Sequence, residues 1–446
     1  MGAELLSLRG YQKDLIAKTY HSLAEGNRRV LTVAPCGSGK SYMFAKMVAD
    51  SRRTEVLILT HRGELLNQHK ALLEALGLKN WRIGMVMTEA NRLGKYKKPG
   101  LIVADEAHLS LANSWQKVIE YYNVPTVGLT ATPVRLTGRP LGDVYDDLVT
   151  GITVKELIAA GRLAPYTYYA PFTVEADGIN VRQGDYVLSE LDKLMNDRAI
   201  YGNAVESWKK LASGGKTIAY CVSVKHAEKV AEAFNLAGIK AVAVSGNSKN
   251  REQIMQDFRN GKFTVLCNCQ LISEGVSIDD VTCCLLLRPT ESLALHIQQS
   301  QRCMRYMKGK QAVIIDCVGN YTRHGLPDDD REWSLTQSVS KRKQVDEVGN
   351  LTIRTCPECF MIFKTADRCP YCGAQYPLSP REIKAKEEIE LARITAEEMA
   401  AVEAAKKKAR QEVGRCRTVE DLWRIARERG YAPGWVYKMA KAKGIR

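Results

Sequence analysis

The chain has 446 residues, of which 45% are hydrophobic and 26% are charged, a composition typical of a folded protein and not of a disordered one. Its longest apolar runs, such as residues 281–287, are far shorter than the roughly 18 to 20 residues of a membrane-spanning helix, and its first residues lack a secretory signal, so we expect no membrane partner and a cytoplasmic location. The net charge is +15, and residues 406–446 hold 13 Lys or Arg against 4 Asp or Glu, which indicates either a polyanion-binding tail or a solvated basic face.

Short apolar runs alternate with helical patterns along most of the chain, as in parallel α/β domains. In the first half, strands are predicted at residues 30–34, 56–60, 82–87, 101–105 and 126–132. In the second half, they are predicted at residues 217–222, 241–246, 264–269, 283–288 and 312–317. We therefore predict two similar α/β domains with parallel sheets, at residues 1–170 and 201–335, joined by a linker at residues 171–200.

A glycine-rich segment, APCGSGKS at residues 34–41, lies between a predicted strand and a predicted helix. In this context the pattern predicts a phosphate-binding loop for ATP and makes a chance glycine-rich turn the weaker alternative. The glycines let backbone N–H groups turn toward phosphate oxygens, Lys40 supplies positive charge, and the Ser41 hydroxyl can bind Mg²⁺. The loop residues predicted to bind ATP are Pro35, Cys36, Gly37, Ser38, Gly39, Lys40 and Ser41.

A second motif, LIVADEAH at residues 101–108, places two carboxylates at the end of a buried strand. Asp105 is predicted to bind Mg²⁺, and Glu106 is predicted to orient the attacking water. LTATP at residues 129–133 follows at the end of the next predicted strand, where hydroxyl groups could connect the ATP site to a nucleic-acid track.

These motifs, in this order, resemble those of superfamily 2 helicases, which have two RecA-like domains. LRGYQ at residues 8–12 resembles the Q-motif, which implies that Arg9 and Gln12 contribute to ATP binding and that Gln12 reads adenine. THRGELLNQH at residues 60–69 resembles motif Ia, which contacts the nucleic-acid backbone in this family. The resemblance therefore implies nucleic-acid binding by Thr60, His61 and Arg62.

The second predicted domain continues the resemblance. Residues 219–228 resemble motif IV, which implies nucleic-acid contact by Ser223, and residues 267–278 resemble motif V, which implies ATP contact by Gly275. IQQSQRCMR at residues 297–305 resembles motif VI. In this family its arginines reach the ATP from the facing domain, which implies an ATP-binding role for Gln298 and catalytic roles for Arg302 and Arg305.

Residues 287–305 look especially like RadD-type DNA-repair helicases and their phage-encoded relatives. This resemblance implies an ATP-dependent DNA helicase or translocase of repair, recombination or replication, in a bacterial or phage-infected cell. The implied partners are single-stranded or branched DNA and possible replication or repair proteins, and the chain is expected to be a monomer.

Several positions depart from the family pattern. Ser277 replaces a common aspartate, Gln301 and Cys303 replace glycines, and residues 85–100 form a shorter segment than in relatives, which would thin the first sheet. Both arginines remain, one helical turn apart on an expected helix, so we expect the arginine pair to be intact, although Gln301 and Cys303 could shift it. The alternatives are a DNA-stimulated ATPase that remodels without unwinding, the motor segment of a restriction system, or a degenerate DNA-binding protein without ATPase activity.

A cysteine module follows at residues 350–378. Its ligand pattern is C-x₂-C-x₉-C-x₂-C, which fits tetrahedral Zn²⁺ better than two disulfides. The predicted zinc ligands are Cys356, Cys359, Cys369 and Cys372.

The last part of the chain is predicted to be helical, with a charged linker at residues 379–413 and a basic helical hairpin at residues 414–446. The hairpin interleaves Tyr431, Trp435 and Tyr437 with lysines. We expect an aromatic core with a basic outer face, on which Lys438 and Lys441 bind nucleic acid.

Overall fold

The computed structural model describes most of the chain. The described residues are 6–51, 53–134, 140–171, 179–182, 185–195, 198–246, 248, 250–269, 278–336, 353–356, 358–364, 366, 368–375, 412–413, 416–429, 433–443 and 445. The chain divides into two compact units, residues 1–376 and residues 377–446, which are described separately below. Among the described helices, none is both long enough and apolar enough to cross a bilayer.

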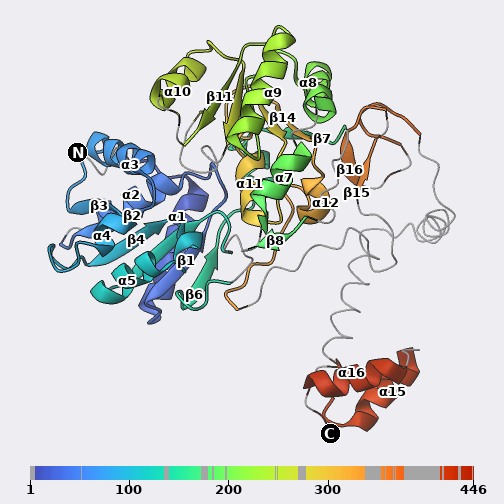
Figure 1. Cartoon of the computed structure of the whole chain (residues 1–446). Coiled ribbons are helices and arrows are strands. Elements are labelled where there is room, and N and C mark those ends of the chain that lie inside the picture. Colours follow the sequence, from blue (N-terminus) through green and yellow to red (C-terminus); the bar gives the residue numbers. More distant parts are fainter. Residues whose placement is uncertain are drawn as a thin grey trace. The chain divides into compact units, whose positions relative to one another are not determined.

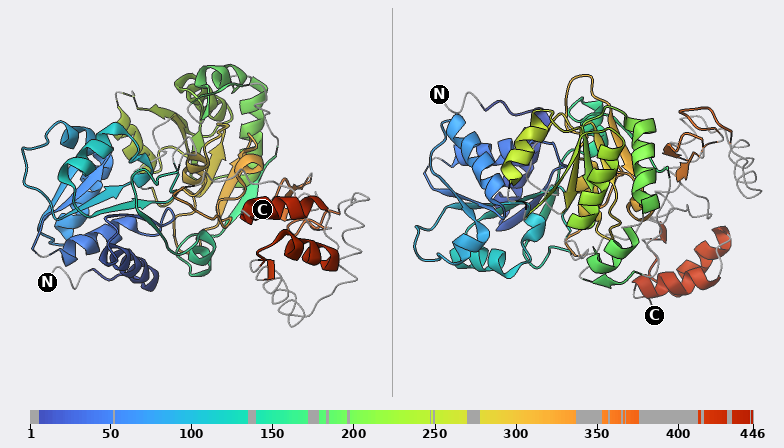
Figure 2. Two further views of the ribbon diagram at one scale, coloured as in Figure 1. Left: turned by 90° about the horizontal axis from the view of Figure 1, so that it is seen from below. Right: turned by 45° about the horizontal axis from the view of Figure 1, so that its top comes forward.

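The first domain is a six-stranded parallel sheet between two helical layers (Figures 1 and 2). Its strands, in spatial order, are β3 (Trp81–Met85), β2 (Val56–Thr60), β4 (Leu101–Asp105), β5 (Thr126–Thr130), β1 (Arg29–Val33) and β6 (Asp147–Thr150). Its helices are α1 (Gly10–Ala24), α2 (Lys40–Asp50), α3 (Gly63–Ala75), α4 (Val86–Ala90), α5 (Asn113–Tyr122) and the short 3₁₀ helix η1 (Ala107–Leu109).

The central strands are buried on both faces, because their side chains alternate between the two helical layers. Val30 belongs to the cluster beneath α1, α2 and α3, whereas the next residue, Leu31, packs with α4 and α5. This explains why these strands read as continuous apolar runs. The short segment before β4 does not reduce the sheet below six strands.

The second domain is also a six-stranded parallel sheet, with a single large core. Its strands, in spatial order, are β11 (Ala241–Ser245), β12 (Val265–Cys269), β10 (Thr217–Tyr220), β13 (Cys283–Leu286), β14 (Ala312–Asp316) and β7 (Tyr166–Tyr169). The helices from this part of the chain are α6 (Val154–Ala159), α7 (Leu188–Met195), α8 (Arg198–Ala212), α9 (Val224–Leu236), α10 (Arg251–Arg259), α11 (Leu293–Ser300) and α12 (Asn320–His324). The predicted α/β class with tandem parallel sheets is confirmed.

The structure corrects the boundary expected between the domains. The sequence placed residues 1–170 in the first domain, but Tyr166–Tyr169 forms β7 and pairs with β14 at the edge of the second sheet. This strand has no long apolar run, because it is a short edge strand with two half-buried residues, Tyr166 and Thr167. The apolar runs that predict the buried strands are therefore absent from this segment.

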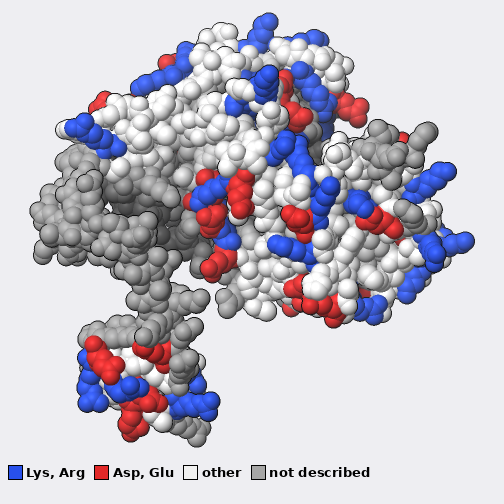
Figure 3. Space-filling model, turned by 180° about the vertical axis from the view of Figure 1, so that it is seen from behind, with Lys and Arg blue, Asp and Glu red and all other residues white. Residues whose placement is uncertain are grey.

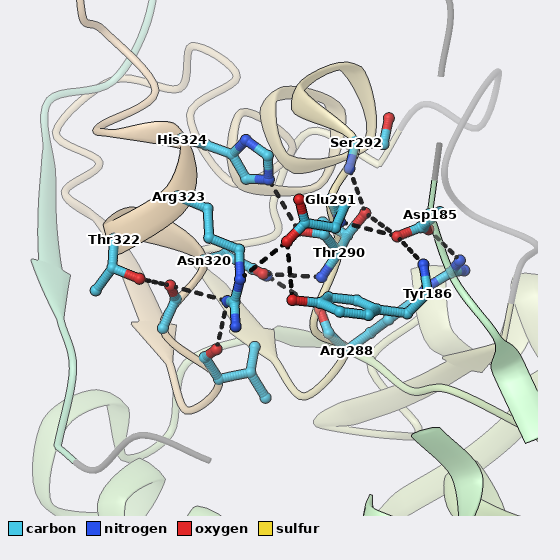
Figure 4. A network of polar contacts seen from close by, with 12 residues as sticks. Asp185, Tyr186, Arg288, Thr290, Glu291, Ser292, Asn320, Thr322, Arg323 and His324 are labelled. Atoms are coloured by element: carbon cyan, nitrogen blue, oxygen red, sulfur yellow. Dashed lines mark hydrogen bonds and ion pairs between the residues drawn. The ribbon is translucent and has the colours of Figure 1, made fainter. Parts of the chain in front are cut away.

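The segment expected to be a linker, residues 171–200, also contains structure. A two-stranded hairpin of β8 (Val181–Arg182) and β9 (Asp185–Tyr186) is held against the start of α11 (Figure 4). The Asp185 carboxylate accepts hydrogen bonds from the Thr290 hydroxyl and the Glu291 backbone N–H, both at 2.9 Å. Arg288 donates to the same carboxylate at 2.9 Å. The hairpin therefore fixes the turn from which α11 begins.

The cysteine module forms a small ribbon beside β7. Its strands β15 (Ile353–Thr355) and β16 (Ile362–Lys364) are antiparallel. The Ala170 N–H donates to the Phe360 carbonyl at 2.9 Å, and Tyr169 forms a bridge with Met361. The ribbon therefore contacts the exposed edge of the second sheet.

The C-terminal unit contains a helical hairpin of α15 (Val419–Arg429) and α16 (Pro433–Lys443) around a small apolar core. Thr418 caps α15, since its hydroxyl accepts the Asp421 backbone N–H at 3.2 Å. Trp435 packs against the core, whereas Tyr437 is 66% exposed, so the expected aromatic core is only partly correct. Tyr431 and most of the predicted linker at 379–413 lie outside the described residues.

Buried histidines in the second domain predict acid sensitivity. Burial lowers the pKa of His226 and of His324 to about 4. The unfolded chain binds these protons at a pKa of about 6.5, so stability is retained above pH 6.5 and lost as the pH falls toward 4. We expect about 2 kcal/mol of unfolding free energy to be lost per histidine at pH 5, measured by denaturant titration at pH 7 and pH 5.

An exposed histidine provides the control for this prediction. His21→Gln should keep the full pH dependence, because His21 is largely exposed, whereas His226→Phe should weaken it. Equal unfolding free energies at pH 7 and pH 5 in the unmodified protein would contradict the prediction.

Candidate functional site

A cleft of about 470 Å³ is lined by residues from both domains. The first domain contributes the loop after β1, the start of α2, one side of α3 and the end of β4. The second domain contributes α11 and the turn after it. Predicted site residues that line this cleft are Cys36, Gly37, Gly39, Lys40, Ser41, Asp105, Glu106, Gln298, Arg302 and Arg305.

The phosphate-binding loop has the backbone conformation that only glycine adopts easily. Gly37 and Gly39 have φ angles of +81° and +86°. A Cβ atom on Gly39 would lie 2.4 Å from Nε2 of Gln12, so a side chain there would displace this neighbour. The loop leads directly into α2, whose first residue is Lys40. Its backbone N–H groups and the helix N-terminus make this end of the cleft suitable for a phosphate.

Gln12 supports the loop from α1. Its Nε2 donates to the Ser38 carbonyl and its Oε1 accepts the Arg9 backbone N–H, both at 2.9 Å. Neither Arg9 nor Gln12 is among the lining residues of the cleft, and the same is true of Pro35 and Ser38. Adenine recognition by Gln12 stays a prediction. The observed contacts leave room for it, because the amide nitrogen and the amide oxygen can each make a further hydrogen bond.

Asp105 and Glu106 stand where β4 ends. Asp105 is 5% exposed, and its Oδ2 lies 2.7 Å from Nε2 of His69. Burial opposes ionisation of Asp105, but the hydrogen bond and charge of His69, together with Lys40, lower the pKa of its carboxyl group. Glu106 has a left-handed backbone with φ of +51°, a strained conformation of the kind found at functional sites.

Sequence reasoning missed His69 as a site residue. It lies on α3 between two buried leucines, Leu65 and Leu73, at the four-residue spacing of one helix face. A histidine on an otherwise apolar helix face is the signal that was available in the sequence. Gln68, its neighbour, also lines the cleft.

The structure corrects the expected position of the arginines. Helix α11 ends at Ser300, so Arg302 and Arg305 lie on the turn that follows the helix and not on the helix itself. Arg302 is 8% exposed, and Nη1 of Arg305 lies 3.1 Å from the Asp279 carboxylate. The chain leaves the helix here because residues 301–304 form tight turns that lead to a bridge between Arg305 and Leu163.

The two residues that replace glycines are accommodated inside the second domain. Gln301 is 2% exposed and donates from Nε2 to the Pro327 carbonyl at 3.0 Å. Cys303 is fully buried, and its thiol contacts the Ser300 carbonyl at 3.4 Å. Both arginines line the cleft together with Lys40, so the side chains at 301 and 303 do not turn them away from it.

Other predicted residues are placed less directly. The Thr60 hydroxyl is buried and accepts the Arg62 backbone N–H at 3.2 Å, so it shapes the turn before α3. Nε of Arg62 lies 3.2 Å from Nε2 of His61. The Ser223 hydroxyl caps α9 by accepting the His226 backbone N–H at 3.0 Å, a structural role that the sequence did not predict. Gly275 and Ser277 lie outside the described residues.

Charge on the surface does not by itself mark a nucleic-acid track. Figure 3 shows basic and acidic side chains interspersed over one face of the larger unit. In the C-terminal unit, Lys438 and Lys441 are exposed on α16, as expected. A nucleic-acid contact there stays a prediction.

The four cysteines of the ribbon form a compact cluster. Sγ of Cys356 lies 3.5 Å from Sγ of Cys372, and Sγ of Cys359 lies 3.6 Å from Sγ of Cys369. All four sulfur atoms lie within 4.8 Å of one another. These distances are too long for disulfides and fit the edges of a thiolate tetrahedron around a Zn²⁺ ion with bonds of about 2.3 Å.

Family models match most of the two domains. Residues 5–92 and 85–135 match the type III restriction enzyme res subunit model, and residues 200–307 match the helicase conserved C-terminal domain model.

Among similar proteins, a 51.5 kDa protein of Lactococcus phage (isolate 7-9) is 38% identical over 82% of this chain and 82% of its own length. The candidate ATP-dependent helicase IRC3 of Saccharomyces cerevisiae is 30% identical over 70% of this chain, which spans 51% of the yeast protein. In structure, the chain is similar to a fragment of a candidate HsdR subunit of a type I restriction enzyme from Vibrio vulnificus. The TM-score is 0.57 at 20% identity, with 70% of this chain and 64% of that chain covered.

From the cysteine cluster we predict that the purified protein contains zinc in a fixed ratio to the chain. We expect about one Zn²⁺ per chain, released by a thiol-reactive mercurial and measured with a colorimetric metal indicator. Cys369→Ser should lose most of the zinc, because it removes one of the four ligands. Cys36→Ser should retain it, since Cys36 is half-buried in the cleft and lies outside the cluster. Purified protein that has four reduced cysteines in the ribbon and no metal would contradict the prediction.

Proposed function

Because this chain belongs to the superfamily 2 helicases, we propose that it is an ATP-dependent DNA helicase or translocase that hydrolyses ATP between its two RecA-like domains. One observation carries the proposal. The cleft combines Lys40, Asp105 and Glu106 of the first domain with Arg302 and Arg305 of the second. These are the side-chain types that phosphoryl transfer to water requires.

In the proposed reaction, the first domain binds and polarises the triphosphate. The loop N–H groups and Lys40 hold the β- and γ-phosphates at the start of α2. Asp105 and Ser41 offer oxygen ligands of the kind that Mg²⁺ prefers, and the lowered pKa of Asp105 keeps it ionised at neutral pH. Bound Mg²⁺ would offset the charge on the phosphate oxygens. Glu106 would orient the water for attack on the γ-phosphorus.

The second domain completes the site. Arg302 and Arg305 would stabilise the charge that develops on the γ-phosphate oxygens, because they line the cleft from the second domain. The site is complete only when the two domains approach each other. Hydrolysis and product release would therefore alternate with closure and opening of the cleft, and this cycle would step the protein along DNA.

We also propose where DNA is contacted. His61 and Arg62 follow the carboxyl end of β2, and the ATP site lies at the carboxyl ends of the neighbouring strands of the same sheet. In the C-terminal unit, Lys438 and Lys441 give α16 a basic face. We further propose a role in bacterial or phage DNA metabolism, such as RadD-like repair, recombination or replication, in the bacterial cytoplasm. The relative from a phage fits such a host. Zn²⁺ would hold the ribbon in the fold that contacts β7.

The first experiment measures ATP hydrolysis with and without single-stranded DNA. We expect DNA to stimulate hydrolysis and Lys40→Ala to abolish it, because Lys40 supplies the charge that holds the phosphates. Folded, zinc-loaded protein with no activity above that of Lys40→Ala would overturn the proposal in favour of a DNA-binding protein. Displacement of a labelled strand from a tailed duplex then distinguishes a helicase from a translocase.

The arginine pair predicts a separate defect. Arg302→Ala or Arg305→Ala should lower the rate of hydrolysis by about 10³, as for other arginines that act on a transferring phosphoryl group. Nucleotide affinity, measured with a fluorescent ADP analogue, should change much less. Arg259→Ala is the matched control, since Arg259 is an exposed arginine of the same domain. Wild-type rates in both cleft variants would show that the turn at 301–305 does not act on ATP.

A further inference from the structure

Helix α3 contacts three regions with different proposed tasks. Its N-cap is Arg62, which ends the segment proposed to contact DNA. In its first turn, Glu64 forms an ion pair with Arg251 of α10 in the second domain. Five residues after Glu64, His69 hydrogen-bonds Asp105 in the ATP cleft. A single rigid element therefore connects the DNA-contacting segment, the second domain and the proposed magnesium ligand.

The bond between His69 and Asp105 has a defined direction. An ionised carboxylate only accepts hydrogen bonds, so Nε2 of His69 must carry the proton that lies between the two groups. The distance is 2.7 Å, and both side chains are almost completely buried, at 3% and 6% exposure. Water therefore competes little for the bond. The His69 ring and the Glu106 backbone N–H, which donates to Oδ1 at 3.0 Å, together set the orientation of the carboxylate.

The remaining contacts of the ring are apolar. The Phe44 ring of α2 meets the His69 ring edge-on, with 4.6 Å between ring centroids. In the described part of the chain, Nδ1 of His69 has no hydrogen-bond partner. Here the polar contact is directed to the one carboxylate that is proposed to bind metal.

We propose that His69 is a positioning residue that couples α3 to the magnesium site. It rests on the proposed function. His69 holds the Asp105 carboxylate in the orientation that binds Mg²⁺, and movement of α3 changes that orientation. Seven residues separate Arg62 from His69, which corresponds to about 10 Å along a helix. A displacement of the helix start by DNA, or by Arg251 as the domains close, is therefore transmitted to the carboxylate without intervening flexible chain.

Outer groups that orient a metal ligand have measurable effects on metal affinity, typically about 10- to 100-fold. Two substitutions separate the hydrogen bond from the packing. His69→Gln keeps an N–H donor the same number of bonds from Cα, whereas His69→Leu keeps apolar volume and removes the donor. Thermal unfolding of both variants reports whether the helix still packs.

The first readout is nucleotide binding and does not require hydrolysis. A fluorescent ATP analogue is titrated into the full chain in Mg²⁺ and in EDTA. The measured quantity is the ratio of nucleotide affinity in Mg²⁺ to nucleotide affinity in EDTA. We expect this ratio to fall about 10-fold in His69→Leu, with the nucleotide affinity in EDTA unchanged, and to fall much less in His69→Gln. The same Mg²⁺ gain in wild type and His69→Leu would overturn the proposal. Equal losses in both variants, or a matching loss in EDTA, would also overturn it in favour of a packing role.

The second readout is the coupling to DNA. The ratio of ATPase rates with and without single-stranded DNA should fall toward one in His69→Leu and stay near wild type in His69→Gln. If DNA stimulated His69→Leu as strongly as wild type, the proposed coupling of α3 to the magnesium site would be wrong. Failure of wild type to hydrolyse ATP would overturn the proposed function instead, and the binding readout would still decide the role of His69.

Discussion

Positively charged side chains from both domains line this one cleft. Lys40 reaches it from one domain, and Arg302 and Arg305 reach it from the other. Cations that approach one another at low dielectric repel strongly unless anions lie between them. Asp105 and Asp279 offset part of this charge. A bound triphosphate would supply the rest, so the stability of the closed form would depend on which nucleotide is present. In the proposed function this dependence converts hydrolysis into domain movement.

To act on a nucleotide in the cleft, Arg302 and Arg305 need a fixed position, which depends on the contacts that hold α11. Figure 4 shows the polar network at the start of α11, where Asp185 of the β8–β9 hairpin holds the Thr290 and Glu291 turn. Glu291 also accepts the Tyr186 hydroxyl at 2.8 Å. The arginines lie just beyond the other end of this two-turn helix. The segment that looked like a linker is therefore part of the support of the site.

The sequence was sufficient for features that depend on local patterns. The phosphate-binding loop, the DEAH segment and five strands of each domain were predicted because glycine spacing and apolar runs are local. Strands β6 and β7 were missed because each is only four residues long, carries mixed side chains and depends on pairing with distant residues. The bond between His69 and Asp105 was missed for the same reason, since the two residues are 36 positions apart. The burial of Gln301 and Cys303 depends on partners such as Pro327, which no spacing rule identifies.

The ribbon has a second structural role, because it covers one end of the edge strand β7. An uncovered edge strand exposes unpaired N–H and C=O groups that can pair with another molecule. Here the end of that edge is occupied by the backbone of Phe360 and Met361, between the first and second pairs of cysteines. Loss of the metal proposed for the cluster would release this cover and leave the end of β7 free to pair with another molecule. The ribbon would then protect the second sheet from intermolecular pairing, whatever the rate of hydrolysis in the cleft.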